Sequence, residues 1–369
     1  MQVLKSEKIA GIVKGLALLS LIYLFLLSIK LFGYSFKAMG AEAAHAIMET
    51  VSNPFVGLIT GILTTALVQS SSMTTSLVVG FVAGGAFGAD PQIAIQLAIP
   101  IIMGANIGTS VTNMLVSYGH VTDSDEFERA FSTSVVHDFF NVLAVIAIFP
   151  LQYFFNILGW TASLMSSAFV GVGGISLFNP LNAIIKPVAK AILHQVHIPW
   201  LGIIVSLLML FFALRFIVKV MKMLVLEKIE VLFDKYIFKT TLRALVLGMV
   251  FTAIVQSSSI TTSLAVPLAA AGVVTITQIY PYALGANIGT TITALLAALS
   301  TTNPAAITIA FSHLIFNLLG IAIFLPLKNI PINMAKKFAE WSKTRKYLPA
   351  LYILFIFFII PGLLIYLLR

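Results

Sequence analysis

Two short runs of uncharged hydrogen-bonding residues interrupt long apolar stretches of this sequence. Residues 69–72 read QSSS and are followed by MTTS, and residues 256–259 read QSSS again and are followed by ITTS. Hydroxyl and amide groups can bond the oxygens of an anion or offer their own oxygens to a hard cation. No Asp, Glu, Lys or Arg occurs between Arg243 and Lys328, an interval that contains the second run. An ion-binding site built on that run would take no counter-charge from its own repeat.

A second pair of motifs follows each QSSS run at a similar distance. Residues 104–110 read GANIGTS and residues 285–291 read GANIGTT. The glycines on either side of each asparagine predict a helix that is broken inside the membrane, where opened helix ends expose backbone polar groups to an ion. The candidate contacts in these motifs are Asn106, Thr109, Asn287 and Thr290.

The lack of fixed charge suggests how two kinds of ion could share one site. A divalent anion is costly to desolvate in a low dielectric unless cations neutralise it. Two sodium ions beside such an anion would give a nearly neutral complex, and each ion would then favour binding of the other. The structural alternative is that these Ser, Thr and Gly residues only pack helices, with hydroxyls bonded to the i−4 carbonyl. The occurrence of the whole pattern twice favours an ion pathway.

The composition predicts an all-α integral membrane protein. Of the 369 residues, 59% are hydrophobic and only 9% are charged, whereas soluble domains carry about 25% charged residues. We attribute the net charge of +9 to cytoplasmic loops and to interfacial segments that contact lipid headgroups, rather than to nucleic-acid binding. The absence of cysteine excludes disulfides and thiolate chemistry.

The motifs recur in the same order, which indicates a duplicated unit. HDFFN at 137–141 returns as HLIFN at 313–317, after the QSSS and GANIGT pairs. We therefore expect an inverted-repeat transporter with re-entrant helical hairpins at QSSS and broken transmembrane helices at GANIGT. The expected parts are an N-terminal helix and connection (1–50), repeat 1 (51–155), connecting helices with an amphipathic segment (156–243), repeat 2 (244–327), and a basic interfacial helix with a last transmembrane helix (328–369).

Three ionisable residues within the repeats are open to more than one interpretation. His137 and His313 could bind substrate or relay protons, or each could tether its helix by a hydrogen bond to a neighbouring carbonyl. Asp138 has no acidic counterpart in repeat 2, where Leu314 stands, and we expect it to face a loop or to form a salt bridge. No nucleophile–base pair, phosphate-binding loop or metal-ligand spacing appears, so we expect no enzyme activity and no resident cofactor.

The sequence resembles the type II sodium-dependent phosphate cotransporter family. The segments VQSSS, AIPIIMGANIGTSVTN, FERAFSTSVVHDFFN and LGANIGTTITA are similar to that family's signature segments. The resemblance covers residues 53–151 and 240–327 and continues through residues 330–338, and it implies a multi-pass protein of the cell membrane. The implied activity is secondary active import of inorganic phosphate, driven by the sodium gradient through alternating access at the two QSSS segments.

The resemblance also implies that the two QSSS segments form the substrate and sodium region, and the assignment of side chains to the two ions is our own. The expected phosphate contacts are Ser70, Ser71, Ser257, Ser258 and Thr290. The expected sodium contacts are Gln69, Ser72, Asn106, Thr109, Gln256, Ser259 and Asn287.

The expected partners are phosphate, sodium and the lipid bilayer, without nucleic acid. A homodimer is compatible with this interpretation, and both termini are expected in the cytoplasm. Two alternatives stay open. One is a passive anion channel, and the other is a sodium-coupled symporter for another oxyanion or a carboxylate.

Overall fold

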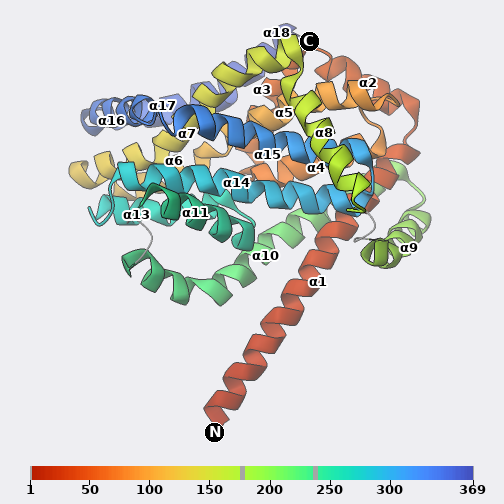
Figure 1. Cartoon of the computed structure of the whole chain (residues 1–369), viewed down its shortest axis with the longest axis horizontal. Helices are drawn as coiled ribbons and strands as arrows, with labels where there is room; N and C mark the ends of the chain where they lie inside the picture. The colour runs from red at the N-terminus through yellow and green to blue at the C-terminus, as the bar shows by residue number, and fades with distance from the viewer. Residues whose placement is uncertain (1, 175–178, 236–239, 369) are drawn as a thin grey trace.

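The chain folds into helices joined by short connections, as the computed structural model shows (Figure 1). The structure describes residues 2–174, 179–235 and 240–368, and the side chains of all of these except 2–10, 179, 222 and 224–235. Within these ranges no residue forms a β-strand. Residues 224–239, which belong to the predicted amphipathic segment, therefore have no described side chains.

The helices run in the following order along the chain. They are α1 (Gln2–Ala38), α2 (Ala41–Val51), α3 (Pro54–Val68), α4 (Ser71–Gly84), α5 (Pro91–Gly108), α6 (Ser110–Ser117), η1 (Tyr118–His120), α7 (Ser124–Phe155), α8 (Ile157–Gly171), α9 (Asn179–Val196), α10 (Pro199–Lys235), α11 (Thr241–Val255), α12 (Ser258–Ser263), α13 (Ala265–Ala270), α14 (Ile276–Thr301), α15 (Pro304–Phe324), α16 (Asn329–Thr344), α17 (Leu348–Leu354), η3 (Phe355–Ile359) and α18 (Ile360–Leu368).

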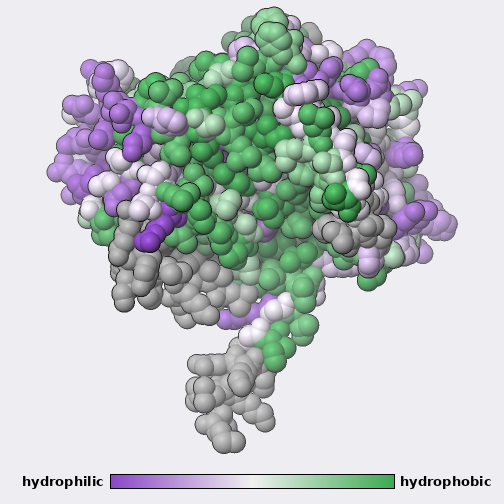
Figure 2. Space-filling model, in the orientation of Figure 1, coloured by the Kyte–Doolittle hydropathy of each residue, from purple (hydrophilic) through white to green (hydrophobic). Residues whose placement is uncertain are grey.

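Seven helical segments of the described chain are long and apolar enough to cross a bilayer. They are Gly11–Ala38, Pro91–His120, Ser124–Phe155, Pro199–Met221, Ile276–Thr301, Pro304–Phe324 and Leu348–Leu368. In Figure 2 a broad green band of apolar residues lies between purple, hydrophilic margins at the two sides of the molecule. Since the hydrocarbon core can accept only satisfied backbone polar groups, helices of this length and composition confirm an all-α membrane protein.

The first QSSS run forms the tip of a helical hairpin made of α3 and α4, which we call hairpin 1 (residues 54–84). Its two arms have only 15 and 14 residues, and a crossing needs about 20. The backbone reverses at Gln69, which is left-handed at φ 57°, and Ser70 caps α4 by accepting a bond from the Met73 N–H. At the other end of α3, a 97° bend at residues 52–53 separates it from α2.

The second QSSS run forms hairpin 2 (residues 241–270) in the same way, from α11 and the consecutive short helices α12 and α13. Gln256 is again left-handed, at φ 60°, and Ser257 accepts a bond from the Ile260 N–H. In both hairpins the backbone therefore reverses at a glutamine, and the serine that follows caps the next helix. This agrees with the prediction of re-entrant hairpins at the two QSSS runs.

The two hairpins enter from opposite ends of the helical bundle. The open end of hairpin 1, at Gly85, lines a cavity of about 580 Å³ together with Asn303, which directly precedes α15. The open end of hairpin 2 lies beside the start of α7, where the Arg129 Nε donates to the Ala270 carbonyl at 2.8 Å. Helix α14 begins shortly after Ala270 and ends just before Asn303, so these two open ends lie at opposite ends of α14. The hairpins are thus inverted with respect to one another.

The GANIGT motifs interrupt their helices less than expected. Helix α14 runs without interruption through residues 285–291, and the only residue between α5 and α6 is Thr109, which itself has right-handed helical angles. The glycines instead permit close helix packing. A Cβ at Gly104 would overlap the Leu58 carbonyl of α3, and a Cβ at Gly285 would overlap the Leu245 carbonyl of α11. Small residues allow helix backbones to approach in a membrane, where apolar burial adds little attraction.

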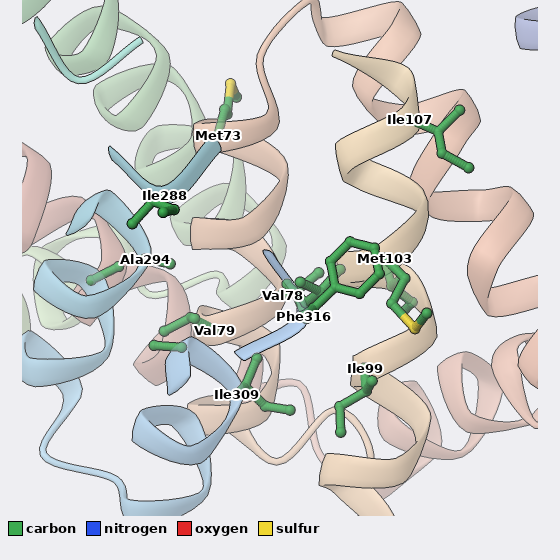
Figure 3. Close-up of a cluster of buried hydrophobic side chains, with 14 of the residues drawn as sticks. Met73, Val78, Val79, Ile99, Met103, Ile107, Ile288, Ala294, Ile309 and Phe316 are labelled. Carbon is green, nitrogen blue, oxygen red and sulfur yellow. The ribbon is translucent and has the colours of Figure 1, made fainter. Parts of the chain in front are cut away.

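The hydrophobic core surrounds hairpin 1 with helices of both repeats. Side chains from α4, α5, α14 and α15 belong to one buried cluster, and Figure 3 shows ten of them labelled. Val78 and Val79 come from the returning arm of hairpin 1, Met103 from α5, Ile288 from α14 and Phe316 from α15. This packing fixes the returning arm, and with it the QSSS tip, against the helices that carry the GANIGT motifs.

Candidate functional site

The tips of the two hairpins meet inside the protein. The Ser72 hydroxyl donates to the backbone carbonyl of Gln256, with an Oγ–O distance of 3.3 Å. Ser72 belongs to the first QSSS run and Gln256 to the second, 184 residues away. The two runs that the sequence marked as a pair are therefore also neighbours in space.

Each tip glutamine is held by a threonine from the helix behind it. The Thr112 hydroxyl donates to the Gln69 side-chain oxygen at 2.7 Å, and the Thr293 hydroxyl donates to the Gln256 side-chain oxygen at the same distance. Each glutamine Nε2 also donates to a backbone carbonyl of its own hairpin. Gln69 donates to the Ala66 carbonyl, and Gln256 donates to the Ala253 carbonyl. These bonds leave both glutamines fixed in matching orientations.

A second contact joins hairpin 2 to repeat 1. The Asn113 amide of α6 donates to the Thr262 hydroxyl at 2.7 Å and accepts from the Ser263 hydroxyl at 2.9 Å. Asn113 is 1% exposed. Hairpin 2 is thus held by a helix of the other repeat through neutral polar groups.

The serines that follow each tip lie at the start of a helix. Ser71 begins α4 and Ser258 begins α12, and both side chains are buried, as are Ser72 and Ser259. The first N–H groups of an α-helix have no partner within the helix, and they carry the positive end of its dipole. The two tips therefore bring hydroxyls and backbone N–H groups into one neutral region.

Thr109 and Thr290 are buried and occupy equivalent positions behind the tips. The Thr109 hydroxyl donates to the Ala105 carbonyl at 3.1 Å, and the Thr290 hydroxyl donates to the Ala286 carbonyl at 3.0 Å. These i−4 bonds satisfy the hydroxyl hydrogens but leave the oxygen lone pairs available as acceptors or ligands. The predicted ion contacts at these two residues stay predictions.

Asn106 and Asn287 are joined to the histidines of the opposite repeat. The Nε2 of His137, in repeat 1, lies 2.7 Å from the amide oxygen of Asn287, in repeat 2. The Nε2 of His313, in repeat 2, lies 3.0 Å from the amide oxygen of Asn106, in repeat 1. An amide oxygen can only accept, so each imidazole carries its hydrogen on Nε2. The tethering interpretation of the two histidines agrees with these bonds.

The asparagines of HDFFN and HLIFN complete this network. The Asn287 amide donates to the Asn141 side-chain oxygen at 2.8 Å, and the Asn141 amide donates to the Asn106 backbone carbonyl at 2.9 Å. On the other side, the Asn106 amide donates to the Asn317 side-chain oxygen at 2.9 Å. Both side-chain amide atoms of Asn106 and of Asn287 thus have protein partners, and their predicted sodium contacts remain untested.

The expectation for Asp138 was wrong. Its side chain is fully buried on α7, faces no loop, and forms no ion pair with any described residue. The Tyr352 hydroxyl of α17 donates to its Oδ2 at 2.5 Å, and Ser110 at the start of α6 lies beside it. Asp138 follows His137 in the middle of a membrane-crossing helix, and that position buries it irrespective of its charge.

Several residues of the site were missed from the sequence. Thr112 and Asn113 lie one helical turn beyond Thr109, and Thr293 lies one turn beyond Thr290. A residue three or four positions farther along a helix shares the same face. Extending GANIGTS to GANIGTSVTN with this periodicity would have identified the two positions in repeat 1.

Comparison with known proteins agrees with this architecture. Residues 24–178 and 209–335 match the family model described as Na+/Pi-cotransporter. The chain belongs to this family. The matched residues of the Na+/Pi-cotransporter family include both hairpins and both GANIGT helices, and the family is one of transporters rather than enzymes.

Curated relatives of this family are similar along nearly the whole chain. Sodium-dependent phosphate transport protein 2B of Pongo abelii is 31% identical over 95% of this chain, and so is its Homo sapiens counterpart. Sodium-dependent phosphate transport protein 2A of Rattus norvegicus is 31% identical over 97% of this chain. The chain spans 65%, 64% and 69% of these three proteins respectively. No solved structure matches it.

Proposed function

We propose that this chain imports inorganic phosphate across the cell membrane together with sodium, and that the ions bind between the two QSSS tips. The observation that carries the proposal is the meeting of the inverted hairpins at Ser72 and Gln256. Two half-membrane hairpins that enter from opposite sides and meet at their tips bring the ends of two short helices to mid-membrane depth, which is where secondary transporters bind their substrates.

The chemistry of the tips suits phosphate. Ser70, Ser71, Ser257 and Ser258 can donate hydroxyl hydrogens to phosphate oxygens, and the helix starts at Ser71 and Ser258 add backbone N–H groups. Thr290 lies on α14 behind the second tip.

The oxygens of the same region suit sodium. Gln69 and Gln256 present side-chain oxygens, and Ser72, Ser259 and Thr109 present hydroxyl oxygens. Asn106 and Asn287 belong to the proposed sodium set through their place in the motif, although a sodium ion bound there would have to share or replace the bonds to His313 and His137.

The coupling of the two ions follows from charge. The tip residues are neutral, and among the described residues only Lys30 and Asp138 combine a charged group with a buried side chain. Phosphate bound at the tips would lack a cationic protein partner there, so sodium would supply the compensating charge. Each ion then binds better when the other is present, which is the thermodynamic condition for symport.

Alternating access and topology complete the proposal. The Ser72–Gln256 hydrogen bond links the two tips, and exchanging access requires one hairpin to move against the other. Seven helical segments of the described chain are long and apolar enough to cross the membrane, or eight if the bent pair α2 and α3 forms one span. The cytoplasmic location of both termini stays a prediction.

The decisive experiment measures flux of labelled phosphate into proteoliposomes with the membrane potential clamped. We expect accumulation above equilibrium with an inward sodium gradient and none when potassium replaces sodium. A channel could not concentrate phosphate, and equal rates in sodium and potassium would contradict the proposal. Competition by sulfate, arsenate or small carboxylates separates phosphate from other anions, since a better competitor than unlabelled phosphate would redefine the substrate.

A pair of variants tests the location of the site. Ser71→Ala combined with Ser258→Ala removes one hydroxyl from each tip, and we expect a fall in phosphate uptake of at least tenfold, since each lost bond to a charged ligand costs about 1.5–3 kcal/mol. Ser20→Ala is the matched control because Ser20 is exposed on α1 and bonds only the Leu16 carbonyl. Unchanged uptake in the double variant would remove the tips from the binding site.

A further inference from the structure

A separate cavity lies at the end of α1, where α9 packs against it. Its volume is about 420 Å³, and its lining consists of Tyr34, Lys37, Ala38, Lys190, Leu193 and His194. The cavity combines the apolar sides of Tyr34, Ala38 and Leu193 with the polar ends of the remaining residues. The transport site proposed above uses none of these residues.

The cavity is lined by basic residues, and none of its lining residues is acidic. Lys186, Lys190 and His194 recur every fourth residue on α9, so they share one face of that helix. No Asp or Glu occurs between Glu7 and Glu42, or anywhere in residues 139–226. Neither Lys37 nor Lys190 has an ion pair among the described residues, and both side chains are exposed.

The ends of two candidate membrane spans flank the cavity. The membrane span of α1 ends at Ala38, and the span of α10 begins at Pro199, directly after α9. Between these ends, α9 buries Ile185 and Ala189 in the protein core and exposes Ile184 and Val188. A helix with a lysine face and an exposed apolar face lies in the plane of the membrane interface.

We propose that this cavity binds the phosphate headgroup of an anionic phospholipid, with Lys37 and Lys190 as its cationic contacts. Basic pockets between membrane helices bind such headgroups, and a zwitterionic lipid would leave the cations unneutralised. The apolar part of the lining receives the upper part of the acyl chains. The charge and the depth both favour a membrane lipid over free phosphate, whose chemistry is otherwise the same.

Binding of a lipid headgroup in this cavity would stabilise the position of α1 against α14. About one helical turn before Tyr34, the buried Lys30 donates to the carbonyls of Ser300 and Thr301 at 3.1 and 2.9 Å. These carbonyls end α14, which carries the second GANIGT motif. A lipid bound between α9 and α1 therefore contacts α1, the helix whose Lys30 caps the end of α14.

The test measures lipid binding by native mass spectrometry of the purified full-length chain, with phosphatidylglycerol or phosphatidylcholine added at equal concentrations. We expect phosphatidylglycerol to bind more tightly, and Lys37→Gln with Lys190→Gln to weaken it on the order of 30-fold, since each surface lysine contributes about a fivefold attraction to anionic lipid. Lys336→Gln with Lys337→Gln, on the exposed face of α16, removes the same charge and should bind normally.

Three results would overturn the proposal. They are equal binding of the two lipids, unchanged binding in the Lys37/Lys190 variant, and an equal loss in the Lys336/Lys337 control. Displacement of phosphatidylglycerol by excess inorganic phosphate would also overturn it and make the cavity a site for free phosphate. Lys190→Gln alone serves if the double variant does not fold, with a smaller loss expected. These measurements do not depend on phosphate flux, so the transport proposal can fail while this one stands.

Discussion

The imidazole of His137 in repeat 1 is hydrogen-bonded to the side-chain amide of Asn287 in repeat 2, with an Nε2–Oδ1 distance of 2.7 Å. The reciprocal bond joins His313 of repeat 2 to Asn106 of repeat 1 at 3.0 Å. All four side chains are at most 3% exposed. Each repeat therefore satisfies a buried polar group that belongs to the other, and these two bonds join the repeats behind the hairpin tips.

Replacing His137 with alanine should destabilise the protein by about 1–3 kcal/mol, because the buried Asn287 oxygen then loses its donor. The measurement is thermal unfolding of the purified chain in detergent. His45→Ala is the control, since His45 is exposed and its ion pair is with Glu49 of the same helix. A double-mutant cycle with Asn287→Ala should give a coupling energy near the 0.6 kcal/mol typical of bonds between membrane helices. Equal stability of the His137 and His45 variants would contradict a structural role for the network.

Adding a single methyl group at Gly104 or Gly285 should also destabilise the fold, since the new Cβ would overlap a backbone carbonyl of the neighbouring hairpin. We expect a cost of about 1–3 kcal/mol for Gly104→Ala and for Gly285→Ala, as for other overpacked sites. Unfolding in denaturant would measure it. At Gly362 nothing lies within 4 Å of an added Cβ, so Gly362→Ala should leave stability unchanged or slightly higher. An unchanged free energy of unfolding for Gly104→Ala would mean that these glycines make the helix flexible and do not permit close packing.

The inverted arrangement of the hairpins predicts the sidedness of the loops. His45 on α2 lines the cavity at the open end of hairpin 1, whereas Lys336 lies on α16, which is joined to the start of α7 by the Lys343–Asp125 ion pair. Because the chain has no cysteine, His45→Cys and Lys336→Cys each provide one thiol. An impermeant maleimide should label the two positions from opposite sides of oriented vesicles. Labelling from the same side would refute the inversion.

The cap of α7 should give the protein a small pH dependence in acid. The backbone N–H groups of Glu126 and Asp125 hold the pKa of the Asp123 carboxyl below its ordinary value of 3.8. A depressed pKa means that the charged form favours the folded state, so this contribution is complete above pH 3.8 and is lost as the pH falls through the lower folded value.

Asp123→Asn separates capping from titration, because asparagine also caps a helix but carries no charge. Melting temperature measured across the acidic range should fall more steeply for the wild type than for this variant. Parallel curves would exclude Asp123 as the titrating group, and Asp123→Ala should lower the melting temperature across the whole range.

The hairpins were predictable because local sequence determines their tips. A glutamine followed by serines, between two apolar arms too short to cross a membrane, contains both the reversal at Gln69 and the cap at Ser70. The same pattern at Gln256 and Ser257 doubled the evidence. The pairing of the tips was suggested by the repetition, but the particular bond from Ser72 to the Gln256 carbonyl depends on packing between segments far apart in the chain.

Two features could not be deduced because they depend on neighbours. The glycines of GANIGT have the same identity whether a helix bends or a second backbone approaches it, and only the position of the Leu58 carbonyl decides between these. Asp138 looked like a surface residue because of its charge, while its partner Tyr352 lies 214 residues away. A single sequence holds no signal that connects these two positions.

The exchange of hydrogen-bond partners between the repeats bears on how such a molecule could have arisen. A chain with only one repeat would bury a histidine and an asparagine that cannot reach each other within their own unit. Pairing with a second copy inserted upside-down in the same bilayer would satisfy them in the way seen here. The reciprocal bonds are those expected of a two-fold dimer of half-length ancestors, preserved after gene fusion made the partnership permanent.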